Sequence, residues 1–171
     1  MIGNEELRHL IEGWGLVTDF IDLETQLQPT GFDLTVKTVE RYTSGGAIDF
    51  DNTHRKIAES EAIPFVGGLV DGYIDLPPGV YRIRFNEKLN LRHLPYPISV
   101  ISCYRGTVMR NGNYTALGFW DYGYEGRGEC SFDIRNPHGF RVYANARIHQ
   151  CFFFKATKVV GMYDGQYLFE E

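Results

Sequence analysis

The chain is organised around three neighbouring motifs: YRGTVMRNG at residues 104–112, ALGFWDYGYEGRG at 116–128 and NPHGFRVYANARIHQ at 136–150. Arg105 and Arg110 lie on either side of Gly106 and Thr107, a set that suits an anion with several oxygens, such as a polyphosphate. Asp121 follows in a turn rich in glycine and aromatic residues, where a single acid suits the activation of a water beside that anion. The alternative is a surface hairpin with two solvated arginines and a turn aspartate.

The composition predicts one β-rich globular domain. The 171 residues can bury one hydrophobic core, and 43% apolar with 23% charged residues is an ordinary globular composition. The 19 glycines, 11 tyrosines and 12 phenylalanines favour strands and tight turns. A formal net charge of −5 argues against nucleic-acid binding, which normally needs a basic face. We therefore expect a single domain over residues 1–171 with no nucleic-acid partner.

Nothing in the sequence indicates export, membrane insertion or a zinc site. The N-terminal segment MIGNEELRHLIE lacks the basic-then-apolar plan of a signal peptide, and no apolar run approaches the roughly 20 residues of a membrane span. The five histidines have no paired spacing for a metal, and the three cysteines form no CxxC pair. We expect a cytoplasmic protein with no membrane partner.

The hydrophobic pattern predicts a short helix over residues 4–12 and short strands after it. Asn4 is a candidate N-cap, and Leu7, Leu10 and Ile11 form one apolar stripe. Alternating residues predict a strand from Phe32 onward, a short strand is expected at 47–50, and the polar residues 51–62 predict an exposed loop or hairpin tip. Many short strands separated by turns indicate a sandwich, jelly roll or barrel.

The C-terminal residues 161–171, GMYDGQYLFEE, have two interpretations. A tail rich in tyrosine and glycine is often a frayed terminus. It can equally be a lid that closes over a ligand and excludes water.

Six motifs in order resemble the dUTPase and dCTP deaminase superfamily, and most of all its archaeal dUTPase branch. They are PTGFDLTV, RGTVMRNG, WDYGYEGRG, NPHGFRV, ARIHQ and YDGQY, which together span about residues 28–167. The resemblance implies a distorted jelly-roll β-barrel that assembles as a homotrimer, with active sites at the subunit interfaces. It also implies hydrolysis of the substrate dUTP to dUMP and pyrophosphate, with Mg²⁺ as cofactor.

The resemblance also implies roles for individual residues. Asp121 would orient the attacking water. Phosphate binding would fall to Arg105, Gly106, Thr107, Arg110 and Gln150. Nucleoside binding would fall to Gly123, Tyr124, Gly126, Tyr163, Gln166 and Tyr167, with the last three on the segment that folds over the nucleotide. Asp33 would lie near the triphosphate and contact its magnesium through a water.

Two departures from the superfamily pattern keep other activities open. Gly106 stands where the superfamily usually has serine, whose hydroxyl contacts phosphate or, in deaminases, the catalytic water. The deaminase acid belongs on the strand after the hairpin, where Glu129 and Asp133 are the candidates and an apparent two-residue insertion obscures the register. A dUTP diphosphatase is therefore the main hypothesis, and a dCTP deaminase or a nucleotide-binding homologue without catalysis is the alternative.

Overall fold

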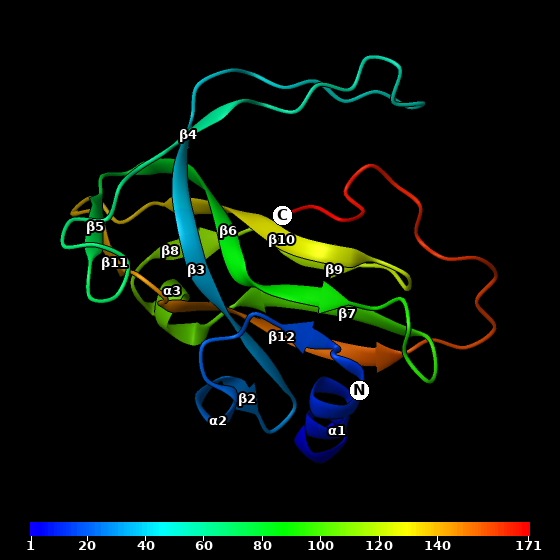
Figure 1. Ribbon diagram of the computed structural model, residues 1–171. Helices are drawn as coiled ribbons and strands as arrows, with labels where there is room; N and C mark the ends of the chain where they lie inside the picture. The colour runs from blue at the N-terminus through cyan, green and yellow to red at the C-terminus, as the bar shows by residue number, and fades with distance from the viewer.

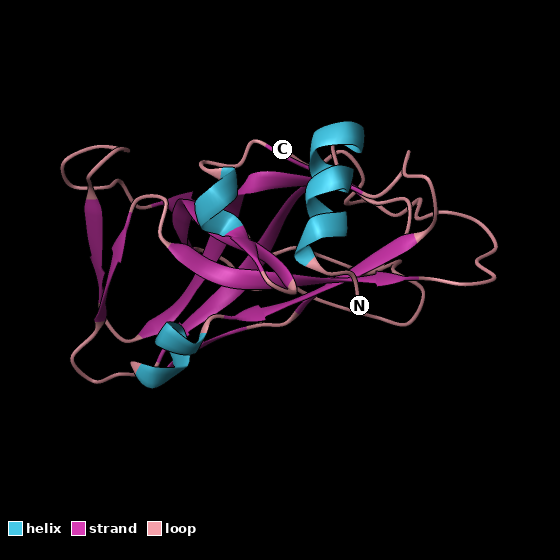
Figure 2. Ribbon diagram, turned by 90° about the horizontal axis from the view of Figure 1, so that it is seen from below, coloured by secondary structure: helices cyan, strands magenta, loops and turns pink.

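A computed structural model, which describes all residues 1–171, shows a curled antiparallel sheet that forms a half-barrel (Figure 1). Three helices lie outside the sheet (Figure 2): α1 (Asn4–Trp14), α2 (Leu23–Gln26) and α3 (Gly106–Arg110). The strands are β1 (Val17–Thr18), β2 (Leu27–Gln28), β3 (Gly31–Tyr42), β4 (Ser60–Ala62), β5 (Tyr73–Leu76), β6 (Gly79–Asn90), β7 (Ile98–Tyr104), β8 (Asn113–Thr115), β9 (Gly118–Trp120), β10 (Glu125–Ile134), β11 (Phe140–Tyr143) and β12 (Arg147–Lys155). None of the helices is long and apolar enough to cross a membrane.

The main sheet has the order β8-β10-β6-β3-β12-β7-β9, and β5 pairs with β11 in a separate two-stranded sheet. The long strands β3, β6 and β12 therefore lie at its centre, although they are far apart in sequence. Their inward side chains belong to one cluster of 29 buried apolar residues. This arrangement agrees with the predicted mainly β fold and places β7 and β9, which precede Arg105 and Asp121, beside each other.

The N-terminal helix α1 buries the predicted stripe of Leu7, Leu10 and Ile11. The helix extends two residues past the predicted end, to Trp14. The prediction of Asn4 as N-cap is wrong, because Gly3 occupies that position and no side chain caps the helix. The first backbone groups are satisfied elsewhere: the Asn4 N–H donates to the Pro29 carbonyl, which ties α1 to the turn before β3.

Strand β3 follows the predicted alternation, with Phe32 and Leu34 in the core. A register shift against β6 between Val36 and Thr38 returns Val39 to the core face, which explains its odd spacing. The opposite face is not solvated as expected. Asp33 is fully buried there, because the neighbouring elements cover this end of the strand.

The segment between β3 and β4 is a long arm that projects from the body of the molecule (Figure 1). The predicted strand at 47–50 is wrong, since only one isolated bridge, Ala47 to Lys56, pairs the two sides of the arm. A lone bridge cannot form a strand because neither side has a further partner. The prediction of an exposed polar loop from residue 51 is confirmed up to β4, which begins at Ser60.

The core contains one imidazole, that of His149 on β12, with no solvent exposure. Its Nδ1 lies 2.9 Å from the Ser102 hydroxyl, its Nε2 contacts the Thr115 hydroxyl, and Phe85 packs 5.3 Å away. Burial lowers the pKa of His149 to about 4, so the ring is neutral in the folded protein at neutral pH.

We predict that His149 makes the protein less stable in acid. Its folded pKa lies below its ordinary value of 6.5, so the unfolded chain takes up more protons than the folded chain. The contribution of His149 to the free energy of unfolding is complete above pH 6.5 and is lost as the pH falls toward 4. The free energy of unfolding, measured by urea denaturation, should fall by up to about 1.4 kcal/mol per pH unit from this group.

The controls for this prediction separate titration from packing. His149→Gln should lower stability at every pH but remove the acid-dependent slope due to this group. Ile148→Val, a change at the adjacent buried position, should cost about 1 kcal/mol and keep the wild-type slope. Equal slopes in wild type and His149→Gln would contradict the prediction.

Candidate active site

A cavity of about 260 Å³ lies between the β9–β10 hairpin and the C-terminal tail. Five of the residues predicted for the site line it: Asp121, Tyr124, Glu129, Tyr163 and Tyr167. Its wall also includes Trp120 and Glu170, which the sequence analysis did not single out. The structure thus brings together an acid from the turn and tyrosines from two segments about forty residues apart in the sequence.

The β9–β10 hairpin packs closely against the C-terminal tail. Gly123 has a φ of 91°, and a Cβ on it would lie 2.5 Å from the Met162 Cβ and 2.9 Å from the Tyr163 nitrogen. No other residue fits this position without strain. The adjacent carbonyl of Tyr122 accepts a 2.8 Å hydrogen bond from the Tyr163 N–H, so the tail lies against the turn that carries Asp121.

The tail continues along the start of β10 (Figure 1). The Phe169 N–H donates to the Glu125 carbonyl, and the Arg127 N–H donates to the Glu170 carbonyl. The Tyr163 ring lies 5.9 Å from the Tyr124 ring. The tail therefore packs against the β9–β10 hairpin of its own chain, and three of its residues, Tyr163, Tyr167 and Glu170, line the cavity. Gln166, predicted to contact the nucleoside, is exposed and does not line the cavity, and Gly126 lies beneath the tail next to Glu170.

Burial shifts the pKa values of two side chains that line the cavity, Tyr124 and Glu170. The pKa of Tyr124 is raised, mainly by burial, so its phenol is neutral and can donate a hydrogen bond. The pKa of Glu170 is also raised, by burial and then by the nearby charge of Glu129. Asp121 is exposed at the mouth of the cavity. An exposed carboxylate beside aromatic walls can accept a proton from a water and hold that water in place.

The predicted phosphate-binding residues form a second group outside the cavity. Arg105 follows β7, and Gly106, Thr107 and Arg110 belong to α3, all half-buried or exposed. Figure 1 shows α3 on one side of the sheet and the tail on the other. No residue of this group lines the cavity. One chain therefore does not bring its own arginines to its own Asp121.

A buried carboxylate organises this second group. Asp33 Oδ2 lies 3.0 Å from Arg105 in an ion pair and accepts a hydrogen bond from Arg147 at 3.3 Å, while its Oδ1 is buried without a hydrogen-bond partner. Burial raises the pKa of Asp33 to about 6, against the opposing effect of Arg105 and then Arg147. Gln150 sits directly opposite Asp33 in the β12–β3 pairing and is half-buried. Arg147, at the start of β12, is therefore a partner of Asp33 in the same chain.

Gly106, which stands where the superfamily usually has serine, has room for a side chain. A Cβ on Gly106 would meet no atom within 4 Å, and its backbone lies outside the left-handed region. Nothing in the fold of one chain requires glycine here. The exposed N–H of Gly106 can still donate to an anion in place of a hydroxyl.

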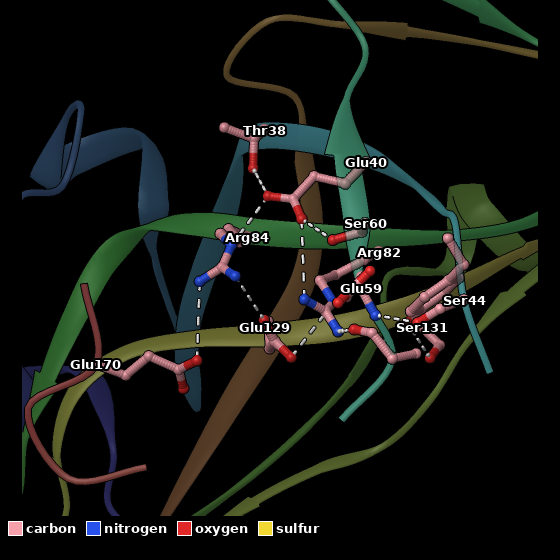
Figure 3. A network of polar contacts seen from close by, with 12 residues as sticks. Thr38, Glu40, Ser44, Glu59, Ser60, Arg82, Arg84, Glu129, Ser131 and Glu170 are labelled. Atoms are coloured by element: carbon pink, nitrogen blue, oxygen red, sulfur yellow. Dashed lines mark hydrogen bonds and ion pairs between the residues drawn. The ribbon is translucent and has the colours of Figure 1, made fainter. Parts of the chain in front are cut away.

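The two candidate deaminase acids differ in position. Glu129 lines the cavity, whereas Asp133 lies outside it and pairs with Arg135. Glu129 belongs to a network on the outer face of the sheet that joins it to Arg82 and Arg84, each 3.6 Å away (Figure 3). The register of β10 against β6 shifts between Arg127 and Glu129, at the point where the sequence showed an insertion.

The same network continues to β3 and the tail (Figure 3). Arg84 donates to Glu40 at 3.0 Å and lies 3.8 Å from Glu170, and Ser60 of β4 also contacts Glu40. The alternation of Arg82 and Arg84 with Ile83 in β6 is the sequence signal that could have revealed this charged face. Glu129 is therefore both a cavity residue and a member of a structural ion cluster.

We predict that Gly123→Ala releases the tail. The new Cβ would overlap the Met162 Cβ, and the left-handed backbone would be strained. Hydrogen exchange of the Tyr163 and Phe169 amides, read by mass spectrometry of the C-terminal peptide, should become at least about tenfold faster. Gly106→Ala is the matched control, because its Cβ meets nothing and it should leave exchange unchanged. A tail as protected in Gly123→Ala as in wild type would show that the hairpin does not hold it.

Comparisons with known proteins identify the family of this chain. Residues 1–156 match the family described as dCTP deaminase-like. Similar proteins include the probable deoxyuridine 5'-triphosphate nucleotidohydrolases of Archaeoglobus fulgidus (38% identical, covering 98% of this chain and 95% of that one) and Methanococcoides burtonii (38%, covering 98% and 96%). The deoxyuridine 5'-triphosphate nucleotidohydrolase of Methanocaldococcus jannaschii is 31% identical over 84% of this chain and 88% of its own length.

A solved structure has the same fold. The 2'-deoxycytidine 5'-triphosphate deaminase of Agrobacterium tumefaciens superposes with a TM-score of 0.61 at 19% identity, covering 89% of this chain. This chain spans only 45% of that deaminase chain, so the likeness concerns the shared domain. The matched family and the near-complete alignment with the archaeal relatives show that the chain belongs to the dUTPase and dCTP deaminase superfamily.

Proposed function

We propose that the protein is a dUTP diphosphatase, which hydrolyses dUTP to dUMP and pyrophosphate. The observation that carries the proposal is the position of Asp121 at the mouth of a cavity walled by Tyr124, Tyr163 and Tyr167. A cavity of about 260 Å³ is at the small end of ligand pockets, which suits a base and sugar with the phosphates outside. The similar archaeal proteins are named as deoxyuridine 5'-triphosphate nucleotidohydrolases, which supports the same activity.

The proposed chemistry is attack of water on the α-phosphorus. Asp121 accepts the proton of the water as its oxygen bonds to phosphorus, and the bond to the bridging oxygen breaks so that pyrophosphate leaves. Tyr124, Tyr163 and Tyr167 would stack on the nucleoside, and the tail would act as a lid that excludes other water. Arg105, Arg110, Thr107 and the Gly106 N–H would balance the charge that builds on the phosphates, and Gln150 would contact them.

Magnesium fits this scheme as an ion that arrives with the triphosphate. No cluster of three or more His, Cys, Asp or Glu side chains in the chain could hold a metal by itself. Mg²⁺ normally keeps several waters and binds through one or two carboxylates plus substrate phosphates. The unpartnered, buried Oδ1 of Asp33, next to the arginines, is an acceptor for such a water. When bound, the ion would neutralise phosphate charge.

The active enzyme is proposed to be a homotrimer of distorted jelly-roll subunits with sites at the interfaces. The support is the separation seen in one chain, where Arg105, Thr107 and Arg110 lie outside the cavity that contains Asp121. In an assembly, the arginine group of one copy would face the cavity of the next. A cytoplasmic location is proposed because Cys103, Cys130 and Cys151 are all free thiols.

A dCTP deaminase remains the second candidate, favoured by one observation: Glu129 lines the cavity. Against it, Gly106 supplies no hydroxyl for a catalytic water. Product analysis by anion-exchange chromatography, with dUTP and dCTP offered separately in Mg²⁺, tests both activities. dUMP from dUTP alone supports the diphosphatase, dUTP from dCTP supports the deaminase, and no product from either nucleotide supports a silent binding homologue.

We predict that Asp121→Asn lowers pyrophosphate release from dUTP by about 100-fold or more, because the amide cannot take the proton of the water. Nucleotide affinity, measured by calorimetry with a non-hydrolysable dUTP analogue, should change little. Asp164→Asn is the matched control, since Asp164 is an exposed acid of the tail outside the cavity. Equal losses of affinity and turnover would contradict the role given to Asp121.

We predict that Arg110→Ala weakens triphosphate binding by about tenfold or more while monophosphate binding stays nearly constant, because a guanidinium–phosphate contact is lost. Arg110 is exposed and forms no ion pair in the chain, so the change should leave the melting temperature unaltered. Arg41→Ala, at another exposed arginine, is the control. An effect that is equal for dUMP and the dUTP analogue would exclude Arg110 from phosphate binding.

A further inference from the structure

Arg84 on β6 does not line the cavity, yet each of its three guanidinium nitrogens faces a different carboxylate. Its Nε donates to Glu40 at 3.0 Å, its Nη2 lies 3.6 Å from Glu129, and its Nη1 lies 3.8 Å from Glu170. These three acids belong to β3, β10 and the tail (Figure 3). Glu129 and Glu170 both line the cavity. One guanidinium thus joins two walls of the cavity to a central strand of the sheet.

The sheet fixes the position of this guanidinium. Strand β6 is paired on both sides, with β3 and with β10, so the backbone of Arg84 has little freedom to move. The hydrogen bond to Glu40 is charge-assisted, and Glu40 is itself held by the Ser60 hydroxyl. Because a guanidinium is planar and rigid, fixing Nε also sets the direction of the other two nitrogens. A lysine ammonium has one nitrogen and cannot reproduce this geometry.

Two ion pairs join the end of the tail to β6, and they differ in exposure. Lys88 pairs with Glu171, whose side chain is 73% exposed, so water screens their attraction. The side chains of Arg84 and Glu170 are 26% and 27% exposed, so solvent screens their attraction less. The backbone of Glu170 is held at the same place, because its carbonyl accepts from the Arg127 N–H at 2.7 Å. Exposure therefore favours the Arg84 pair as the one that stabilises the docked tail.

Arg84 also offsets a repulsion between the two acids of the cavity. The pKa of Glu170 is raised by burial and then by the charge of Glu129, whereas Arg84 lowers it. The two carboxylates are thus close enough to repel each other, and the guanidinium attracts both. Removal of Arg84 would leave this repulsion without compensation. Glu129 is fixed in a paired strand and Glu170 lies near the chain terminus, so the tail is the part that would move.

We propose that Arg84 is a positioning residue of the site, which holds the tail at the cavity through Glu170 and keeps Glu129 against the wall formed by β10. Tyr163 and Tyr167 line the cavity from the same tail, so their positions depend on how firmly its end is held. The catalytic consequence rests on the proposed diphosphatase, in which these tyrosines contact the nucleoside. The contact between Arg84 and the tail does not depend on any activity.

Hydrogen exchange of the purified chain, measured without nucleotide, tests this contact. Glu170→Gln removes the charge of the tail residue and keeps its shape, and Arg84→Gln removes the guanidinium. Each change should speed exchange in the C-terminal peptide 163–171 by about threefold or more, as for loss of one partly buried ion pair. Arg141→Gln is the matched control. It breaks an ion pair with Asp75 on the separate β5–β11 sheet and should leave the peptide unchanged.

The double variant Arg84→Gln with Glu170→Gln distinguishes a specific pair from general loosening of the sheet. Since both changes break the same contact, the double variant should exchange no faster than Arg84→Gln alone. Arg84→Gln should also lower the melting temperature, because Glu40 loses its hydrogen bond. Glu170→Gln should keep the wild-type melting temperature, so it tests the tail even where Arg84→Gln fails to fold. Additive effects on exchange, or wild-type exchange in Glu170→Gln, would overturn the proposal.

The kinetics of pyrophosphate release from dUTP test the consequence for the site. The KM of Glu170→Gln and of Arg84→Gln should rise by about threefold or more while kcat changes less than about twofold, because contacts to the nucleoside act equally in the ground and transition states. Arg84→Lys keeps the charge but not the fork, so its KM should lie between those of the wild type and Arg84→Gln.

These measurements separate the positioning role from the proposed function. Faster tail exchange in variants of a protein that does not hydrolyse dUTP would refute the proposed function and leave the contact of Arg84 with the tail standing. An active enzyme whose KM is the same in wild type, Glu170→Gln and Arg84→Gln would refute the positioning role and leave the function standing.

Discussion

The buried carboxylate of Asp33 is the constraint on which the centre of the sheet depends. Removing a carboxylate from water costs several kcal/mol unless opposite charges and hydrogen bonds replace the solvent. Here Arg105 at the end of β7 and Arg147 at the start of β12 supply those charges to a residue of β3. The three strands must therefore keep one register, and loss of both arginines would leave an unpaired buried charge, at a cost of about 3–5 kcal/mol. Arg105 thus has a structural task besides any contact with phosphate.

The tail adds a second constraint, because it is docked on the hairpin. Backbone hydrogen bonds at Tyr163 and Phe169, and the packing of Tyr163 on Tyr124, hold it against the turn that carries Asp121. A segment that is held in place by such contacts loses less conformational entropy when a ligand binds. The same contacts are few and lie at a chain terminus, so they can open locally without unfolding the sheet. The tail can thus be ordered in advance and still open to give a ligand access to the cavity.

The local sequence pattern predicted the helix and strand elements well. The features that it missed depend on pairing between residues that are far apart in the sequence. The stripe of Leu7, Leu10 and Ile11 and the alternation from Phe32 depend only on neighbouring residues, and both were confirmed. The short strand at 47–50 was wrong because a strand needs a partner, and the arm offers only one bridge. The motif resemblance named five of the residues that line the cavity and missed others, such as Trp120 and Glu170. It could not show that Asp33 pairs with Arg147, since that contact joins residues 114 positions apart.

The ion-pair network on the outer face of the sheet affects which reaction the cavity can catalyse. A deaminase acid must exchange a proton with the base, and therefore needs oxygens free to contact it. Each oxygen of Glu129 lies 3.6 Å from a guanidinium, that of Arg82 or that of Arg84, in an ion pair without a hydrogen bond, and Oε2 is buried with no hydrogen-bond partner. Arg84 also pairs with Glu40 and approaches Glu170 of the tail. Moving Glu129 toward a base would leave these partly buried guanidiniums without a partner, a loss that opposes the motion. Asp121 has no such partner and stays at the mouth of the cavity, which favours hydrolysis at the phosphate over chemistry on the base.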